Sequence, residues 1–187
     1  MHKHHSALGL ASPVEAATGH DIAARRPIQP VTLVRPHAAA RAARFFVEKF
    51  PGKSMYAVKA NPSPELLRVL WASGITHYDV ASIAEVRLVA DTLPGATLCF
   101  MHPVKAEEAI AEAYHVHGVR VFSLDSLDEL GKIMRATGDA ADLTLCVRLR
   151  VSSEHSKLSL ASKFGVAPGE AKDLLFAARQ AADALGL

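Results

Sequence analysis

The sequence predicts an α/β fold built on a parallel sheet, because one structural unit recurs along the chain. Short apolar runs typical of buried strands are each followed by a segment in which apolar residues have helical spacing. The five runs are Met55–Val58, His77–Ala81, Thr97–Met101, Val119–Leu124 and Leu143–Leu149. Strands of this kind, joined by crossover helices, form a parallel sheet that is covered on its faces.

The chain divides into a lead-in, residues 1–30, and an ordered domain, residues 31–187. We expect the lead-in to be extended or poorly ordered, because prolines and glycines are spread through it. A helix is predicted over Pro36–Phe50, where apolar residues gather on one side and a Pro-Gly pair follows as a stop signal.

The segments between the strands carry helix start and stop signals. The predicted starts are Ser63 with Pro64, a capping box of Ser82 with Glu85, a second capping box of Ser126 with Glu129, and Pro168. The predicted stops lie near Gly74, Gly118, Gly138 and Gly186. Two architectures fit this pattern. Because a closed eight-stranded β/α barrel has about 250 residues and this chain has 187, periodicity alone favours a doubly wound open sheet.

Composition indicates a soluble globular protein. Half of the residues are hydrophobic, and 21 Lys plus Arg are interspersed with 19 Asp plus Glu, which argues against a nucleic-acid surface. No apolar stretch approaches the ~18 residues of a membrane span, and Met1–Gly19 lacks the apolar core of a secretory signal. Cys99 and Cys146 lie in apolar stretches and are expected to be buried thiols, so the expected location is the cytoplasm. No metal site is expected, because the N-terminal histidines have no second cluster of ligands.

Polar residues stand at the carboxyl ends of the predicted strands, where the chemistry of parallel α/β folds collects. They are Lys59, Asp79 with Ser82, His102 with Lys105, Asp125, and Arg148 with Arg150. Helix capping is the simpler explanation of Ser82 and Asp125. Asp79 and Arg148 would be costly to bury unpaired, so we expect them to contact each other or a ligand. These strand ends favour a barrel, and the lack of a glycine-rich phosphate loop argues against a nucleotide site.

Lys59 is the leading catalytic candidate. It follows the apolar run Tyr56–Val58 and precedes the turn residues Asn61–Pro64. Packing of its stem among apolar residues would desolvate the amine and favour the neutral, nucleophilic form. The alternative is a strand-end lysine whose ammonium stays in water.

Six motifs occur in an order and spacing that can be compared with known families. They are Tyr56–Asn61, Tyr78–Ser82 with Glu85, His102–Lys105, Leu124–Ser126 with Glu129 and Leu130, Val147–Leu149, and Ser162–Gly165. This set resembles the fold-type III pyridoxal-phosphate (PLP) decarboxylases of group 4, and is most similar to their ornithine decarboxylase-like branch. The resemblance implies an alanine racemase-like (β/α)8 barrel, of which about five βα units are present here.

The resemblance also implies a PLP-dependent carboxy-lyase in which Lys59 holds the cofactor covalently. Asp79 and Arg148 match positions that line the cofactor pocket. Glu85 matches an acidic position near the mouth, although helix capping explains it as well. Ser162–Gly165 matches a mobile loop, or is an ordinary turn. The implied substrate is a small basic amino acid: first L-ornithine, converted to putrescine in polyamine biosynthesis, with lysine or diaminopimelate as alternatives.

The chain departs from the family in what would follow Leu187. The family continues with further barrel strands, a phosphate loop, an acid that pairs with the pyridine nitrogen, and a C-terminal β domain that completes a homodimer. We therefore expect a truncated form, in which the homodimer could be lost and unaided catalysis is not expected. Two other classes stay open. One is a noncatalytic decarboxylase-like binding protein, and the other comprises PLP homeostasis proteins and alanine racemases, which these motifs fit less well.

Overall fold

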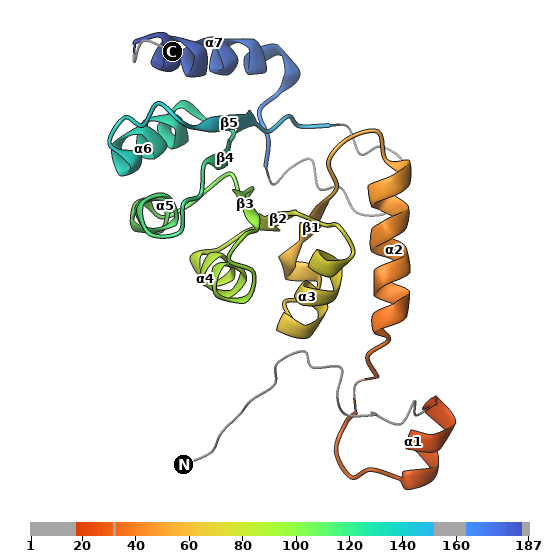
Figure 1. Cartoon of the computed structure of the whole chain (residues 1–187). Coiled ribbons are helices and arrows are strands. Elements are labelled where there is room, and N and C mark those ends of the chain that lie inside the picture. The colour runs from red at the N-terminus through yellow and green to blue at the C-terminus, as the bar shows by residue number, and fades with distance from the viewer. Residues whose placement is uncertain (1–17, 32, 152–163, 185–187) are drawn as a thin grey trace, which may run out of the picture.

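The computed structural model describes residues 18–31, 33–151 and 164–184, and Figure 1 shows their arrangement. The helices are α1 (Gly19–Arg25), α2 (Pro36–Lys49), α3 (Pro64–Ala72), α4 (Ile83–Thr92), α5 (Glu107–His115), α6 (Leu127–Thr137) and α7 (Pro168–Ala184), with a 3-10 turn η1 (Val58–Ala60). The strands are β1 (Met55–Ala57), β2 (His77–Val80), β3 (Thr97–Phe100), β4 (Val121–Leu124) and β5 (Thr144–Val147).

The strands form one parallel sheet in the order β1-β2-β3-β4-β5, which is also their order in the chain. Each helix from α2 to α6 packs against the next, and Figure 1 shows α3 to α6 in one layer along the outside of the sheet. A doubly wound sheet would reverse its strand order and carry helices on both faces. The observed winding is that of a β/α barrel, so the predicted barrel segment of about five βα units is confirmed.

The hydrophobic core lies between the sheet and the helix layer. Because side chains alternate across a strand, every second residue points toward the helices. The buried residues of this outer face are Tyr78, Val80, Leu98, Phe100, Phe122 and Leu124. The rings of Phe100 and Phe122 meet with centroids 6.3 Å apart. The residues between them, among them Asp79 and Cys99, belong to the inner face.

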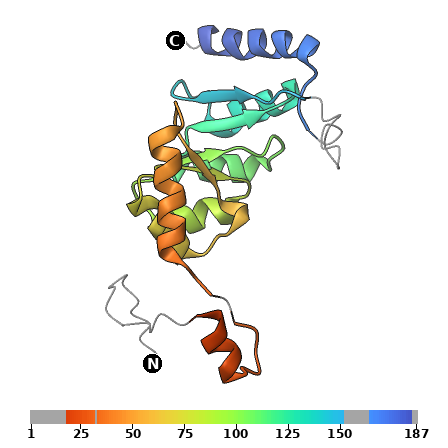
Figure 2. The ribbon, with the colours of Figure 1, turned by 90° about the vertical axis from the view of Figure 1, so that its right-hand side faces the viewer.

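Local signals placed most helices correctly. Ser63 caps α3 with Pro64 at its first position, and Gly138 ends α6 in the left-handed conformation at φ 69°. One prediction was wrong within residues 1–30, because Thr18 and Asp21 cap one another and start the short helix α1. In Figures 1 and 2, α1 lies apart from the sheet, and none of its residues is buried. The predicted stop at Gly186 lies outside the described residues.

An apolar cavity of about 530 Å³ lies between α2, β1 and α3. It is lined by Ala39, Ala42, Ala43, Phe46, Phe50, Lys53, Ser54, Met55, Tyr56, Leu66, Leu70 and Ile75. None of these residues stands at the carboxyl edge of the sheet. The cavity is therefore distinct from the cluster of polar strand-end residues.

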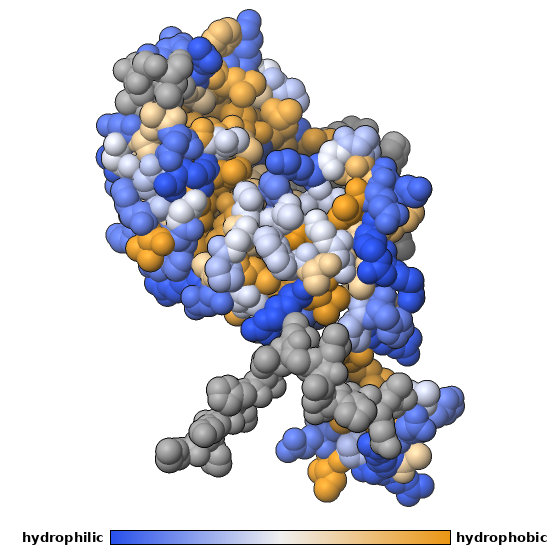
Figure 3. All heavy atoms as spheres, in the orientation of Figure 1, coloured by the Kyte–Doolittle hydropathy of each residue, from blue (hydrophilic) through white to orange (hydrophobic). Residues whose placement is uncertain are grey.

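Apolar side chains also reach the surface near β5 and α7, in the upper half of Figure 3. They include Leu149, Val151, Leu175 and Phe176, each more than half exposed. The described residues thus leave part of this region's apolar surface uncovered. Among the same residues, no helix has both the length and the apolar character needed to cross a membrane.

Candidate functional site

Three of the strand-end residues predicted from the sequence, Lys59, His102 and Arg148, act electrostatically on Asp79, the last but one residue of β2. This carboxyl is half-buried, and desolvation raises its pKa above the ordinary value. The positive charges of Lys59 and Arg148, and that of His102 when its ring is protonated, oppose the increase, whereas the negative charge of Glu85 adds to it. The carboxyl ends of β1, β2, β3 and β5 therefore share one electrostatic site.

Replacing Asp79 by asparagine is expected to raise the free energy of unfolding at pH 7. Burial raises the pKa of Asp79 in the folded chain, so the folded state binds this proton more tightly than the unfolded state does. The free energy of unfolding therefore falls as the pH rises from the unfolded-state pKa to the folded-state pKa. Asparagine cannot ionise, so the free energy of unfolding of the variant does not fall in this pH range. Urea unfolding at a series of pH values should show the gain at neutral pH and none below the unfolded pKa of about 3.9.

Asp91→Asn on the exposed side of α4 is the matched control and should change little. A loss of stability in Asp79→Asn at pH 7 would mean that attraction to the surrounding cations outweighs the desolvation of this carboxylate.

Lys59 lies in η1, directly after β1, and its side chain is exposed. The expectation that apolar neighbours desolvate its amine is wrong, because β1 ends at Ala57 and the backbone turns before Lys59. Two local bonds define the turn. The Tyr56 hydroxyl donates to the carbonyl of Asn61 at 3.2 Å, and the Asn61 side chain accepts from the amide of Ser63 at 3.0 Å. The lysine amine is consequently accessible from solvent at the mouth.

Glu85 acts as a helix cap and also faces the site. Its carboxylate accepts a hydrogen bond of 2.6 Å from the amide of Ala81, while the Ser82 hydroxyl accepts from the amide of Glu85 at 3.3 Å. Both bonds hold the start of α4 against the end of β2. The same carboxylate is close enough to Asp79 to raise the pKa of that residue.

Phe164 joins two of the site residues. Its ring centroid lies 5.4 Å from the Arg148 guanidinium carbon and 5.1 Å from the His102 ring centroid. Residues 162 and 163 of the predicted loop motif lie outside the described residues. Phe164 places an aromatic surface between a cation and an imidazole, and cation–π contact of this kind orients a guanidinium.

Asp125 has a role that the sequence did not reveal. Helix capping was expected, but Ser126 caps α6 and the Asp125 carboxylate accepts a hydrogen bond of 2.8 Å from the amide of Gly165. Gly165 precedes Val166, whose amide donates to the carbonyl of Arg148 at 2.9 Å. The segment after the loop is therefore fastened to the ends of both β4 and β5. Since 40 residues separate Asp125 from Gly165, no local signal could have indicated this contact.

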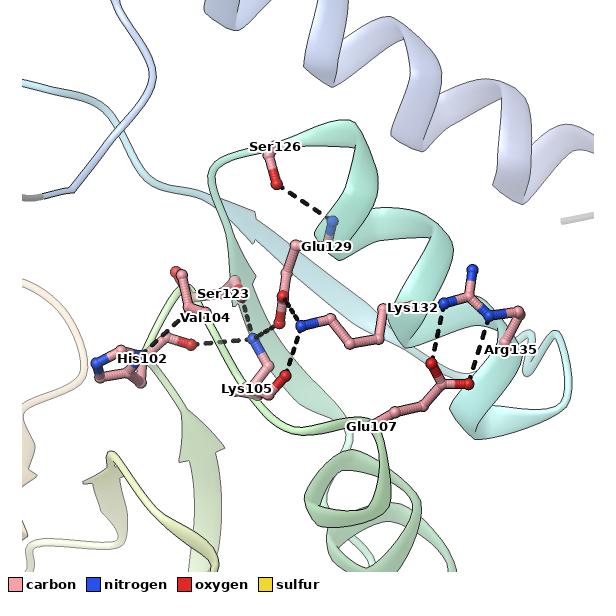
Figure 4. Close-up of polar contacts among 9 residues, drawn as sticks. All are labelled: His102, Val104, Lys105, Glu107, Ser123, Ser126, Glu129, Lys132 and Arg135. Atoms are coloured by element: carbon pink, nitrogen blue, oxygen red, sulfur yellow. Dashed lines mark hydrogen bonds and ion pairs between the residues drawn. The ribbon is translucent and has the colours of Figure 1, made fainter.

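Glu129 is a second such case. Its amide donates to the Ser126 hydroxyl, as in the predicted capping box, but its carboxylate is buried and paired with Lys105 and Lys132 (Figure 4). The predicted capping box of Ser126 and Glu129 is thus half correct. The structure places Glu129 beside Lys105, which with His102 belongs to the strand-end residues predicted from the sequence.

The arrangement suits a small ligand that carries a carbonyl and anionic groups. An accessible primary amine can attack a carbonyl carbon, a neighbouring carboxyl with a raised pKa can hold a proton, and a guanidinium can bind an anion. The chemistry of this donor set fits an aldehyde cofactor bearing a phosphate. Among the described residues, no group of three or more His, Cys, Asp or Glu is arranged to hold a metal ion.

Residues 37–186 match the family described as pyridoxal-dependent decarboxylase, pyridoxal binding domain. The lysine/ornithine decarboxylase of Selenomonas ruminantium is 36% identical over 127 residues, which are 67% of this chain and 31% of that protein. Human antizyme inhibitor 2 is 32% identical over 124 residues, 66% of this chain and 26% of that protein. The chain thus spans about a third or less of the length of these relatives.

Solved structures of similar proteins share the fold. A variant of SrLDC in complex with PLP superposes with a TM-score of 0.74 at 28% identity, covering 89% of this chain and 43% of that one. The lysine/ornithine decarboxylase of Vibrio vulnificus complexed with putrescine has a TM-score of 0.71 at 30% identity, with 87% and 42% covered.

Proposed function

The chain belongs to the pyridoxal-dependent decarboxylase family, through the pyridoxal-binding domain, and we propose on this premise that it forms the lysine-bearing part of a decarboxylase of basic amino acids. The observation that supports the proposal most strongly is the gathering of Lys59, Arg148 and His102 around the Asp79 carboxyl at one sheet edge. These residues come from four separate βα units, so their convergence is a property of the fold.

In this proposal each residue of the site has a defined task. Lys59 would hold PLP through its Nζ atom, and the cofactor supplies an electron sink for loss of the substrate carboxylate. Arg148, braced by the Phe164 ring, offers guanidinium donors to an anionic group. Asp79 can hold or release a proton near Lys59, and burial raises the pKa of its carboxyl above the ordinary value.

L-ornithine is the substrate that we propose first, with putrescine as the product and polyamine biosynthesis as the context. Several relatives carry the name ornithine decarboxylase, and one similar structure is complexed with putrescine. Lysine and arginine are alternatives, because other similar structures are lysine and arginine decarboxylases. Diaminopimelate is a further alternative, which rests on the motif resemblance alone. The change in absorbance of the PLP-loaded chain on addition of each amino acid would rank the four.

A noncatalytic binding protein is the second candidate function. It is favoured by the similarity to human antizyme inhibitor 2. Such a protein needs neither an accessible lysine nor a nearby carboxyl whose pKa is raised. Retention of both Lys59 and Asp79 therefore favours the cofactor-binding proposal.

Covalent capture of the cofactor tests the proposal. The chain is mixed with PLP, reduced with borohydride, and mapped by peptide mass analysis. We expect modification at Lys59 in a stoichiometric yield, and none in Lys59→Arg, which keeps the positive charge near Asp79 but removes the nucleophilic amine.

Lys53→Arg is the matched control, because this exposed lysine lies at the opposite end of β1. It should leave the labelling of Lys59 unchanged. Equal labelling of Lys53 and Lys59, or no labelling at all, would contradict cofactor binding and favour the noncatalytic function.

A further inference from the structure

A buried ion pair lies beside the loop that follows β3. The side chains of Lys105 and Glu129 are 0% and 3% exposed, and the Lys105 Nζ atom is 2.8 Å from Glu129 Oε1. The other carboxylate oxygen of Glu129 is 2.6 Å from Nζ of Lys132. Figure 4 shows the two lysines converging on Glu129 from opposite sides. A charge buried this deeply is tolerated only where its partners are held in place.

Lys105 also binds the backbone of its own loop and of β4. Its ammonium donates to the carbonyl of His102 at 2.9 Å and to the carbonyl of Ser123 at 2.6 Å. The contact with Glu129 is an ion pair, so the Lys105 ammonium is held by two hydrogen bonds to carbonyls and by one charge partner. The Lys132 ammonium in turn donates to the carbonyl of Lys105 at 2.5 Å. The loop is therefore clamped to β4 and α6 at both of its ends.

The clamped loop determines the orientation and the tautomer of the His102 ring. The amide of Val104 donates to Nδ1 of His102 at 3.2 Å, so Nδ1 is an acceptor and the neutral ring carries its proton on Nε2. In Figure 4 the ring points away from the Lys105 ammonium. It meets the Phe164 ring in a T-shaped contact, and its protonated form would lower the pKa of Asp79.

We propose that Lys105 and Glu129 are positioning residues for His102, and that the His102 Nε2–H donates a hydrogen bond to an anionic group of the bound cofactor. Lys105 cannot do this itself, because its side chain has no exposed surface. Lys105 acts on the ring indirectly, because its hydrogen bond to the carbonyl of His102 fixes the backbone that carries the ring. The ligand contact rests on the proposed function, whereas the positioning of the ring does not.

Two measurements on the full chain test the two halves of the proposal. Nitrogen-15 NMR of histidine-labelled chain reports the tautomer of the His102 ring, assigned among the ten histidines with His102→Gln. Absorbance titration reports the affinity for PLP. The test variant is Lys105→Met combined with Glu129→Leu, which removes both charges so that neither is left buried alone.

Arg135→Met is the matched control. It breaks the exposed pair of Arg135 with Glu107, which joins α6 to α5 in the same view but does not touch the loop. We expect a single Nε2–H tautomer in the unchanged chain and in the control, and a mixture of tautomers in the double variant.

We also expect PLP affinity to fall about tenfold in the double variant and in His102→Gln, the loss of one hydrogen bond to a charged group. Combining all three substitutions should bring no additional loss, since Lys105 and Glu129 act through His102. An unchanged tautomer in the double variant, or additive losses of affinity, would overturn the positioning role, and an unchanged PLP affinity in His102→Gln would overturn the ligand contact. Failure of the unchanged chain to bind PLP would instead overturn the proposed function, with the NMR result still deciding the positioning.

Discussion

Replacing Lys105 alone by methionine is expected to lower the free energy of unfolding by about 3 kcal/mol or more. The substitution leaves the Glu129 carboxylate, 3% exposed, with only the partly exposed Lys132 as a charge partner. It also removes the donor for the carbonyls of His102 and Ser123. Urea unfolding at neutral pH measures the difference.

Adding Glu129→Leu to this variant should recover much of the lost stability, because an apolar pair of similar volume needs no desolvation of charge. The exposed pair of Arg135 with Glu107 provides the comparison, since Arg135→Met is expected to change stability little. If the single Lys105 variant were as stable as the double one, the buried pair would not be held together by charge.

Replacing Gly165 by alanine is expected to open the connection between the loop segment and β5. Gly165 has φ +100°, and an added Cβ would lie 2.8 Å from the amide nitrogen of Arg150 and 2.9 Å from the carbonyl carbon of Leu149. Both are backbone atoms that cannot rotate away. Steric overlap and the left-handed conformation together should destabilise the segment by about 3 kcal/mol.

Amide hydrogen exchange is the appropriate measurement for Gly165→Ala. The amides of Arg150 and Val166, bonded at 2.9 Å to carbonyls across the bridge, should lose protection. Gly138→Ala is the matched control, because Gly138 has φ +69° but no atom within 4 Å of its added Cβ. It should cost only about 1 kcal/mol and leave the bridge protected. Unchanged protection in Gly165→Ala would show that the segment tolerates a side chain.

Most elements of the fold could be predicted because their signals are local. Capping at Ser63 and Ser126, the glycine stop at Gly138 and the five apolar runs each involve neighbouring residues. The strands are shorter than predicted by one to three residues, because apolar residues continue past the point where sheet pairing stops. The short helix α1 was missed, since its capping by Thr18 lies within a stretch with many prolines and glycines.

The choice between an open sheet and a barrel could not be made from periodicity. Both architectures alternate strands and helices in the same way. They differ in strand order and in the faces that the helices cover, which depend on contacts between units. The placement of polar residues at strand ends favoured the barrel, and the unreversed strand order confirms it.

The sequence by itself determined the residue types of the candidate site and their position at strand ends, because these depend on local hydrophobic pattern and motif spacing. Only the tertiary structure showed that Lys59 is exposed, that Asp125 holds Gly165, and that Glu129 is buried with Lys105. Each of these facts depends on where the backbone turns or on residues distant in the chain. Burial and pairing of charge arise only when the βα units pack together, so no pattern along one unit records them.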